Sequence, residues 1–234
     1  MQQSTQSKEK PIKVSIIIPT RKRSHLLKDR LEVLFNNTPE LESEKAELII
    51  CYDADDKETE AFLDSNIVKA MKVMCNPLET PANKWNTACK IALGNWLVTI
   101  SDDCVPQPNW LANALNTKNY GFLGLPDGVT GDRNKQFTPL YMMTKEWARK
   151  FHGGVLVIPH YKSWYADVET CARAQASLTF RLAKNSVVRA LHPLFGNAEN
   201  DEIYQIGQSR QKEDLKIFNE RKIEGFPDDF ESVL

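Results

Sequence analysis

Short apolar runs alternate with segments of helical spacing along the first half of the chain. The first run, 14–18, is rich in β-branched residues and ends at Pro19, which is the pattern of a strand buried on both faces. Runs of this kind predict four strands, at 14–18, 47–52, 71–75 and 96–100. The segments between them predict three helices, at 26–35, 58–68 and 83–93. Gly94 is placed to cap the last of these helices.

The order of these elements decides the fold class. Strands and helices alternate as β-α-β-α-β-α-β, and a strand that is reached through a crossover helix lies parallel to the preceding strand. We therefore expect an α/β fold with a largely parallel sheet covered by helices on both faces.

The second half of the chain is less regular. Its pattern predicts a Gly- and Pro-rich loop at 121–131, a strand at 138–143, a helix at 144–151, an irregular segment at 159–165, a helix from near Asp167 and a strand at 186–191. The charged stretch 205–222 has a weak helical period. It predicts a surface helix followed by a frayed end.

The composition is that of an ordinary globular domain. The chain has 234 residues, of which 41% are hydrophobic and 26% charged, so it can bury a core without disulfide bonds. A net charge of -1 gives no reason to expect a nucleic-acid partner, and no apolar stretch approaches the roughly 20 residues of a membrane span. Residues 1–12 are polar, lack the apolar segment of a secretory signal, and predict a disordered lead-in. Together with five scattered cysteines, these features predict a cytoplasmic protein.

Polar and charged groups follow three of the predicted strands. They are Pro19, Thr20 and Arg21 after the first strand, Asp53, Asp55 and Asp56 after the second, and Asp102 and Asp103 after the fourth. Ligands of open parallel sheets bind at the carboxyl ends of the strands, so these groups are candidates for a binding site. The chain has no G-x-G-x-x-G after the first strand and no P-loop, so a diphosphate bound here would need a cation. Paired carboxylates are suitable ligands for Mg²⁺ or Mn²⁺.

Three strings of sequence resemble the family-2 glycosyltransferases, which have the GT-A fold. The strings are VSIIIPTRKR, ELIICYDADD and NKWNTACKIALGNWLVTISDDCVPQPNWL. The resemblance is close over about 14–115 and looser beyond it. It implies a mostly parallel central sheet flanked by helices, with a smaller acceptor-side subregion. It also implies an inverting enzyme that uses a nucleotide-sugar donor.

The resemblance assigns roles to the groups at the strand ends. By position, the nucleotide-binding residues are Pro19, Thr20, Arg21, Asp53, Asn86 and Asp102. Asp103 is the implied ligand of a metal ion that bridges the diphosphate, and Asp102 the implied contact to the ribose. The family's Asp-x-Asp signature corresponds here to Ser101-Asp102-Asp103, and this departure loosens the assignment between the two aspartates. Asp53 could accept the N3–H of uracil, a contact that cytosine could not offer, so a UDP-sugar is the expected donor. A GDP-sugar is the less favoured alternative and stays open, because guanine has N–H groups of its own.

Two later segments complete the implied site. Trp164-Tyr165-Ala166-Asp167-Val168-Glu169 resembles the acidic motif that supplies the general base, and Asp167 takes the position of the base itself. Glu169 is the alternative base and, with Trp164, a candidate contact to the acceptor. His192 ends the predicted strand 186–191 and takes the position of a second metal ligand, which favours Mn²⁺ over Mg²⁺.

Each of these residues also has an ordinary structural interpretation. Asp103 could start a turn, Asp167 could cap a helix, Asn86 could lie on a helix surface, and His192 could be a surface histidine. Their order at successive strand ends favours the enzyme. The predicted organisation is then a lead-in at 1–12, a nucleotide-sugar-binding half at 13–115, an acceptor-binding and catalytic half at 116–208, and a charged helix and tail at 209–234.

Two alternative functions share the expected fold. A sugar-nucleotide nucleotidyltransferase usually has a glycine-rich loop after the first strand, and PTRKRSH contains no glycine. A non-catalytic module that binds nucleotides or glycans would retain the fold without turnover. The sequence identifies neither the transferred sugar nor the acceptor, which is expected to be a glycan or another hydroxyl compound, and it leaves the oligomeric state open.

Overall fold

The computed structural model describes residues 13–65, 69–130 and 137–234. The predicted lead-in therefore lies outside the described residues, as do the last three residues of the helix predicted at 58–68 and the final residue of the loop predicted at 121–131.

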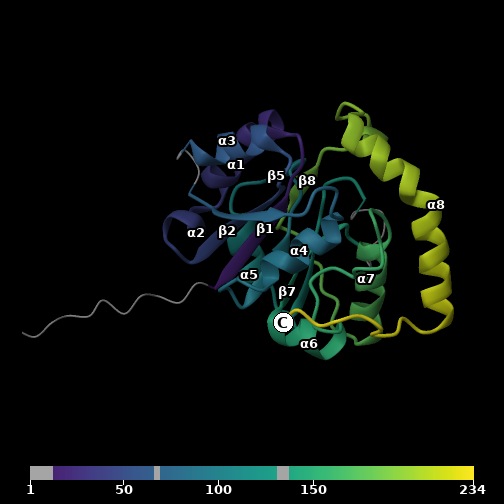
Figure 1. The fold of residues 1–234 in the computed structure, drawn as a ribbon. Helices are drawn as coiled ribbons and strands as arrows, with labels where there is room; N and C mark the ends of the chain where they lie inside the picture. The colour runs from purple at the N-terminus through teal and green to yellow at the C-terminus, as the bar shows by residue number, and fades with distance from the viewer. Residues whose placement is uncertain (1–12, 66–68, 131–136) are drawn as a thin grey trace, which may run out of the picture.

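A six-stranded sheet forms the centre of the molecule (Figure 1). Its strands are β1 (Val14–Pro19), β2 (Ala46–Asp53), β3 (Met71–Cys75), β4 (Trp96–Thr99), β6 (Phe122–Leu125) and β7 (Leu140–Thr144), in the order β3-β2-β1-β4-β7-β6. The first four strands are parallel, β7 is antiparallel to β4, and β6 is antiparallel to β7. A separate two-stranded antiparallel sheet joins β5 (Cys104–Pro106) to β8 (Val188–Ala190). The predicted α/β class with a mostly parallel sheet is confirmed.

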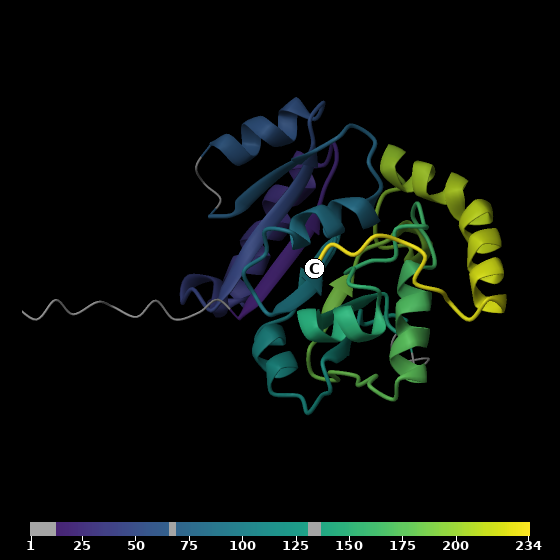
Figure 2. The ribbon, with the colours of Figure 1, turned by 60° about the horizontal axis from the view of Figure 1, so that its bottom comes forward.

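Helices cover both faces of the central sheet (Figures 1 and 2). They are α1 (Ser24–Asn37), α2 (Pro39–Glu42), α3 (Lys57–Asp64), α4 (Pro81–Cys89), α5 (Trp110–Leu115), α6 (Lys145–Phe151), α7 (Ala166–Ala176) and α8 (Glu202–Ile223), with a 3₁₀ turn η1 (Pro193–Phe195). Alternate side chains of β1 point to opposite faces. Ile16 packs in a cluster with α1, α2 and α5, whereas Ile17 packs in a cluster with α4, α6 and α7. Within the described residues, no helix is long and apolar enough to cross a membrane.

The last helix packs along the outside of α7. In both ribbon views α8 lies beside α7, and the Phe218 ring of α8 stacks on Tyr165 with 5.3 Å between the ring centroids. The chain beyond α8 returns across the molecule, where the Val233 N–H donates to the Gly154 carbonyl at 3.1 Å. Val233 and Leu234 pack against the cluster under α6. The predicted surface helix is confirmed, but the prediction of a frayed end was wrong.

Two local expectations also need correction. The helix predicted to reach Gly94 ends at Cys89, and Gly94 does not cap it. A Cβ on Gly94 would lie 2.5 Å from the backbone nitrogen of Ser15, so glycine is required here because two backbone segments approach each other closely. The segment expected to be a loop begins with the buried strand β6 (Phe122–Leu125).

Candidate functional site

The turn after β1 connects the acids at the ends of β2 and β4. The hydroxyl of its first residue, Thr20, donates a hydrogen bond to Asp102 at 2.8 Å. Arg21 forms an ion pair with Asp53 at the end of β2, and Arg23 forms one with Asp102, which follows β4. The carboxyl ends of three parallel strands therefore meet at one edge of the sheet, as the topology predicts for a ligand site.

The acid at the end of β2 is neutralised by two cations. Asp53 has no exposed surface, forms an ion pair with Arg21, and has the Lys84 Nζ atom of α4 2.5 Å from Oδ1. Arg21 also donates two hydrogen bonds to Asp55, at 2.7 and 3.0 Å. The bond to Asp55 raises the pKa of Arg21 despite the opposing effect of burial. Asp53 Oδ1 nevertheless makes no hydrogen bond among the described residues.

The first acid after β4 anchors the turn. Asp102 is 4% exposed and accepts from Thr20 through Oδ2 and from Arg23 Nη1 through Oδ1, the latter at 2.9 Å. Arg23 continues to Asp201, just before α8, with two hydrogen bonds of 2.8 Å. Burial raises the pKa of Asp102 to about 6, although the charge of Arg23 opposes this shift. Both oxygens of Asp102 are thus engaged within the protein.

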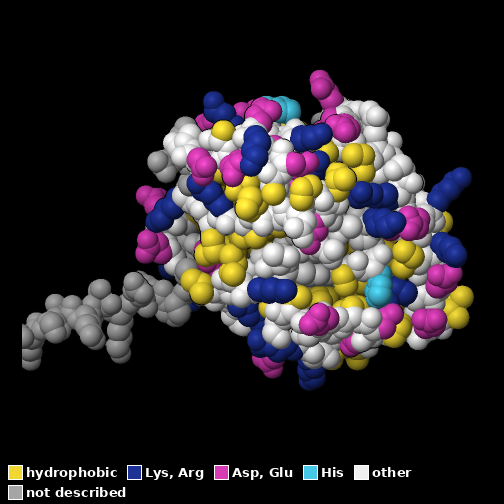
Figure 3. Space-filling model, viewed as in Figure 1, with side chains coloured by type: hydrophobic (Ala, Val, Ile, Leu, Met, Phe, Trp, Pro, Cys, Tyr) yellow, Lys and Arg dark blue, Asp and Glu magenta, His cyan; other side chains and the backbone are white. Residues whose placement is uncertain are grey.

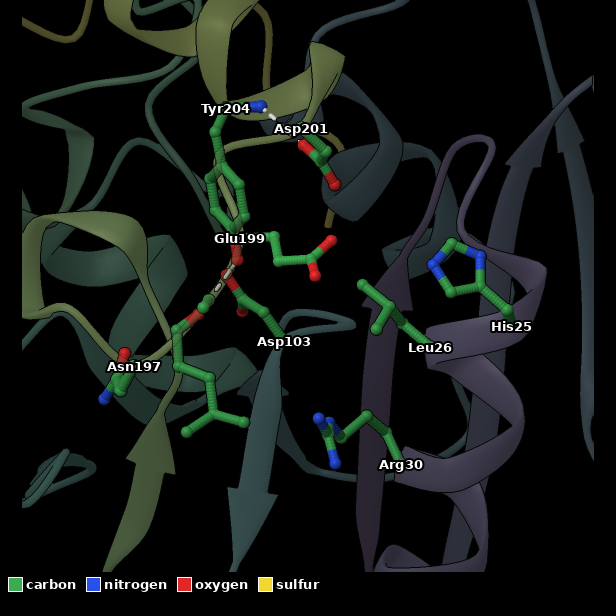
Figure 4. Close-up of a pocket in the computed structure, with 10 residues that line it drawn as sticks. His25, Leu26, Arg30, Asp103, Asn197, Glu199, Asp201 and Tyr204 are labelled. Carbon is green, nitrogen blue, oxygen red and sulfur yellow. Dashed lines mark hydrogen bonds between the residues drawn. The ribbon is translucent and has the colours of Figure 1, made fainter.

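The second acid after β4 is more available. Asp103 is half-buried, and its Oδ2 accepts from the Tyr204 hydroxyl at 2.8 Å (Figure 4). Within the described residues, the one side-chain donor to its Oδ1 is the Cys104 thiol, with the sulfur 3.6 Å away, and a thiol is a weak donor. The Asp103 carbonyl accepts from the Leu191 N–H at 3.0 Å, which extends the pairing of β5 with β8 by one residue. Burial raises the pKa of Asp103.

A cavity of about 140 Å³ lies beside Asp103. Figure 4 shows His25, Leu26 and Arg30 of α1 on one side of it, with Glu199, Asp201 and Tyr204 facing them. The Nε atom of Arg30 is buried without a hydrogen-bond partner among the described residues. The space next to the available aspartate is therefore lined by side chains that can form hydrogen bonds.

His192 reaches the same cluster through Tyr204. The two rings meet edge to face with centroids 4.7 Å apart, and the Trp164 ring lies 6.0 Å from His192 on another side. The His192 Nδ1 atom accepts from the Leu194 N–H at 3.2 Å, which places the proton of the neutral ring on Nε2. Burial, followed by the charge of Arg23, lowers the pKa of His192. Metal binding by this ring requires the bond to Leu194 to break or the proton on Nε2 to leave.

The predicted base lies at the start of α7. Tyr165 takes the N-cap position with φ of 70°, so Asp167 is in the first turn and does not cap the helix. Its carboxylate accepts one hydrogen bond, from the Val168 N–H at 2.9 Å. Burial raises the pKa of Asp167 to about 6. Asp167 is thus a carboxylate without a cation partner among the described residues.

Glu169 has a structural environment instead. It has no exposed surface and accepts hydrogen bonds from Tyr161 at 2.7 Å, from Arg173 at 2.8 and 3.0 Å, and from Arg221 at 3.0 and 3.1 Å. Burial acts to raise the pKa of Glu169, but these hydrogen bonds outweigh it, and the pKa is lowered. The geometry does not place Glu169 where an acceptor could touch it.

Two other predicted contacts are used within the protein. Asn86 accepts from the backbone N–H groups of Leu156 and Val157, both at 3.0 Å, and donates to the Val157 carbonyl at 2.7 Å. Its amide holds this segment against α4, and its contact to a nucleotide stays a prediction. Trp164 donates its ring N–H to the Gly207 carbonyl of α8 at 2.7 Å, so its edge is fixed while one side faces His192.

Sequence patterns did not identify several residues of this region. Lys84, Arg23 and Tyr204 bind the predicted acids, and Asp201 binds Arg23, yet the sequence patterns assign none of the four to the site. Lys84 precedes Asn86 by two positions in a segment already quoted for its resemblance, and Arg23 lies in the basic turn. Tyr204 and Asp201 had no local signal because their role depends on how α8 docks.

The family assignment follows from comparison with known proteins. The model of the family described as "Glycosyl transferase family 2" matches residues 15–164, which include the ends of β1, β2 and β4. The chain belongs to glycosyl transferase family 2. No curated protein sequence matches the chain.

Solved structures show the same fold at low sequence identity. A mannosyltransferase from Pyrobaculum calidifontis, solved with GDP-Man and Mn²⁺, has a TM-score of 0.65 and 16% identity over 93% of this chain. S. aureus TarS 1-349, alone and with UDP-GlcNAc, gives TM-scores of 0.61 and 0.60 with 15% identity over 76% of this chain. This chain covers 65%, 60% and 58% of those three chains.

Proposed function

We propose that this family-2 member is an inverting glycosyltransferase that moves a sugar from a nucleoside-diphosphate donor to the hydroxyl of a glycan or another acceptor. The observation that carries the proposal is Asp103, which follows β4 with one carboxylate oxygen unengaged by a strong donor and a cavity beside it. The structural neighbours with GDP-Man and UDP-GlcNAc support a nucleotide-sugar donor. A UDP-sugar is the first donor to test, and a GDP-sugar the second.

The residues near Asp103 fit a divalent cation, Mn²⁺ or Mg²⁺. Carboxylate oxygens suit both ions, and such ions commonly bind through one or two carboxylates plus the phosphates of the substrate. The described part of the chain contains no group of three or more His, Cys, Asp or Glu side chains that could hold a metal, so the proposed site would need ligands from the diphosphate. When bound, the ion would offset negative charge on the departing diphosphate. Asp103 would hold it, with His192 as the second predicted ligand.

Asp167 is the proposed general base. In an inverting transfer the acceptor oxygen bonds to the anomeric carbon while the bond to the diphosphate breaks, and a carboxylate takes the hydroxyl proton. With a pKa of about 6, Asp167 is mostly ionised at neutral pH and is more basic than an ordinary aspartate. Glu169 is less suited because two arginines and a tyrosine engage its oxygens.

Release of UDP or GDP from a panel of sugar nucleotides with Mn²⁺ tests the proposal. We expect turnover by the wild type, a loss of about 10²- to 10⁴-fold in Asp167→Asn with nucleotide binding retained, and loss of metal-dependent nucleotide binding in Asp103→Asn. Asp64→Asn removes an exposed carboxylate of α3 and is the matched control. Pyrophosphate release from a nucleoside triphosphate and a sugar phosphate would indicate a nucleotidyltransferase instead. Nucleotide binding with no turnover on any donor would indicate a non-catalytic module.

A further inference from the structure

Tyr204, in the first turn of α8, contacts several groups of the proposed site at once. Its hydroxyl oxygen lies 2.8 Å from Asp103 Oδ2 and 2.9 Å from the Leu191 carbonyl (Figure 4). The Arg23 guanidinium lies 4.1 Å from the centre of its ring, and His192 meets the ring edge to face. Tyr204 is only 8% exposed, so these contacts are fixed by packing.

The start of α8 is itself tied to the end of β4. Asp201 caps the helix by accepting from the Tyr204 N–H at 3.0 Å, and the same carboxylate binds Arg23. Arg23 in turn binds Asp102. The backbone of Tyr204 is therefore fixed through Asp201 and Arg23, and these contacts do not involve the Asp103 side chain. The hydroxyl of Tyr204 reaches Asp103 separately.

We propose that Tyr204 is the positioning residue of Asp103. This inference rests on the proposed function, because it assumes that Asp103 binds the cation. A hydroxyl has one proton to donate, and a bond to an ionised carboxylate is stronger than one to a neutral carbonyl. Tyr204 thus holds Oδ2 of Asp103 and leaves Oδ1, with its weak thiol neighbour, for the cation. Its ring also meets His192 edge to face, so Tyr204 contacts both predicted ligands.

Hydrogen-bond partners of a ligating carboxylate typically contribute about 10- to 100-fold to metal affinity or activity. Tyr204→Phe removes only the hydroxyl and keeps the ring that contacts Arg23 and His192. The matched control is Tyr161→Phe, which removes another buried hydroxyl bonded to a carboxylate, that of Glu169, away from Asp103.

The affinity for Mn²⁺ in the presence of UDP, followed by the paramagnetic resonance signal of free Mn²⁺, is the direct test. We expect Tyr204→Phe to bind Mn²⁺ about 10- to 100-fold more weakly than the wild type, while Tyr161→Phe and UDP binding without metal are unchanged. Circular dichroism and the unfolding midpoint verify that each variant is folded.

Three outcomes overturn different claims. Equal Mn²⁺ affinity in Tyr204→Phe and the wild type overturns the positioning role alone. Tighter binding in Tyr204→Phe overturns it too, and shows that the hydroxyl masks Asp103. No Mn²⁺ binding by the wild type, with UDP or GDP, overturns the metal site of the proposed function and the inference with it.

Discussion

Replacing Glu169 by glutamine tests whether the acid next to the proposed base stabilises the fold or takes part in the chemistry. The carboxylate has no exposed surface and joins three parts of the chain: Tyr161 before α7, Arg173 within α7 and Arg221 near the end of α8. Glutamine keeps the size of the side chain and removes its charge. Both arginines then lose the partner that neutralises them inside the protein.

The expected loss can be estimated from the ion pairs. Removing one partner from a buried pair costs about 3–5 kcal/mol of unfolding free energy. Arg173 keeps an ion pair with Asp228, and Arg221 keeps one with Asp229, so the lower end applies. We expect a loss of about 3 kcal/mol. For a domain of this size that lowers the unfolding midpoint by about 6–12 °C.

The pH dependence of this loss has a defined sign. The pKa of Glu169 is lowered in the folded protein relative to its ordinary value of 4.5. Its ionised form therefore stabilises the fold above pH 4.5, and this contribution disappears as the pH falls through the lowered value. The difference in unfolding free energy between wild type and Glu169→Gln should be full at neutral pH and shrink under acid conditions.

Urea denaturation of wild type, Glu169→Gln and Asp167→Asn, paired with turnover, is the assay. Asp167→Asn should lose turnover without losing stability, because burial disfavours the charged form of this aspartate. Glu169→Gln should lose stability and keep turnover at a temperature where it is folded. A variant of Glu169 that is as stable as the wild type but inactive would refute this reasoning and make Glu169 the base.

Two further results are expected. Turnover should rise with pH through about 6 and level off above it, because Asp167 accepts a proton only when ionised. The residual activity of Asp167→Asn should not show this rise. A flat pH profile in the wild type contradicts the assignment of Asp167 as the base. Gly94→Ala should lower the unfolding free energy by about 1–3 kcal/mol, since its Cβ would lie 2.5 Å from the Ser15 nitrogen. In Gly207→Ala of α8 the added Cβ meets nothing closer than 4.0 Å, so denaturant unfolding of that control should show no loss.

Helices and strands with a strong local sequence pattern could be predicted. Short strands that form only because they pair with a distant strand could not. Strands β1, β2 and β4 read as apolar runs because both of their faces are buried. Strand β3 lies at the edge of the sheet and is largely exposed, but its run of apolar residues was still recognisable. Strand β6 has Gly124 in its centre, which reads as a loop, yet a Cβ there would lie 2.6 Å from the Thr138 hydroxyl. Glycine marks close packing at this position. β5 has three residues, too few for a period, and exists because it pairs with β8.

The same distinction separates the parts of the candidate site. Topology alone brings the ends of parallel strands together, so Asp53, Asp102 and Asp103 could be expected at one edge from their positions in the chain. Tyr204 reaches Asp103 across 101 positions of sequence through the docking of a helix whose own pattern is weak. No spacing rule connects such residues, and their contribution could be recognised only from the contacts.

The structure also separates the two adjacent aspartates, whose roles the departure from Asp-x-Asp had left loosely assigned. Asp102 has a hydroxyl on one oxygen and a guanidinium on the other, and binding a ligand would break contacts that hold the turn after β1. Asp103 has one oxygen fixed by Tyr204 and one without a strong donor. A cation binds more favourably to a carboxylate oxygen that does not have to give up an existing ion pair or hydrogen bond. The contacts therefore favour Asp103 as the metal ligand and make Asp102 the residue that keeps Arg23, and through it the start of α8, in place.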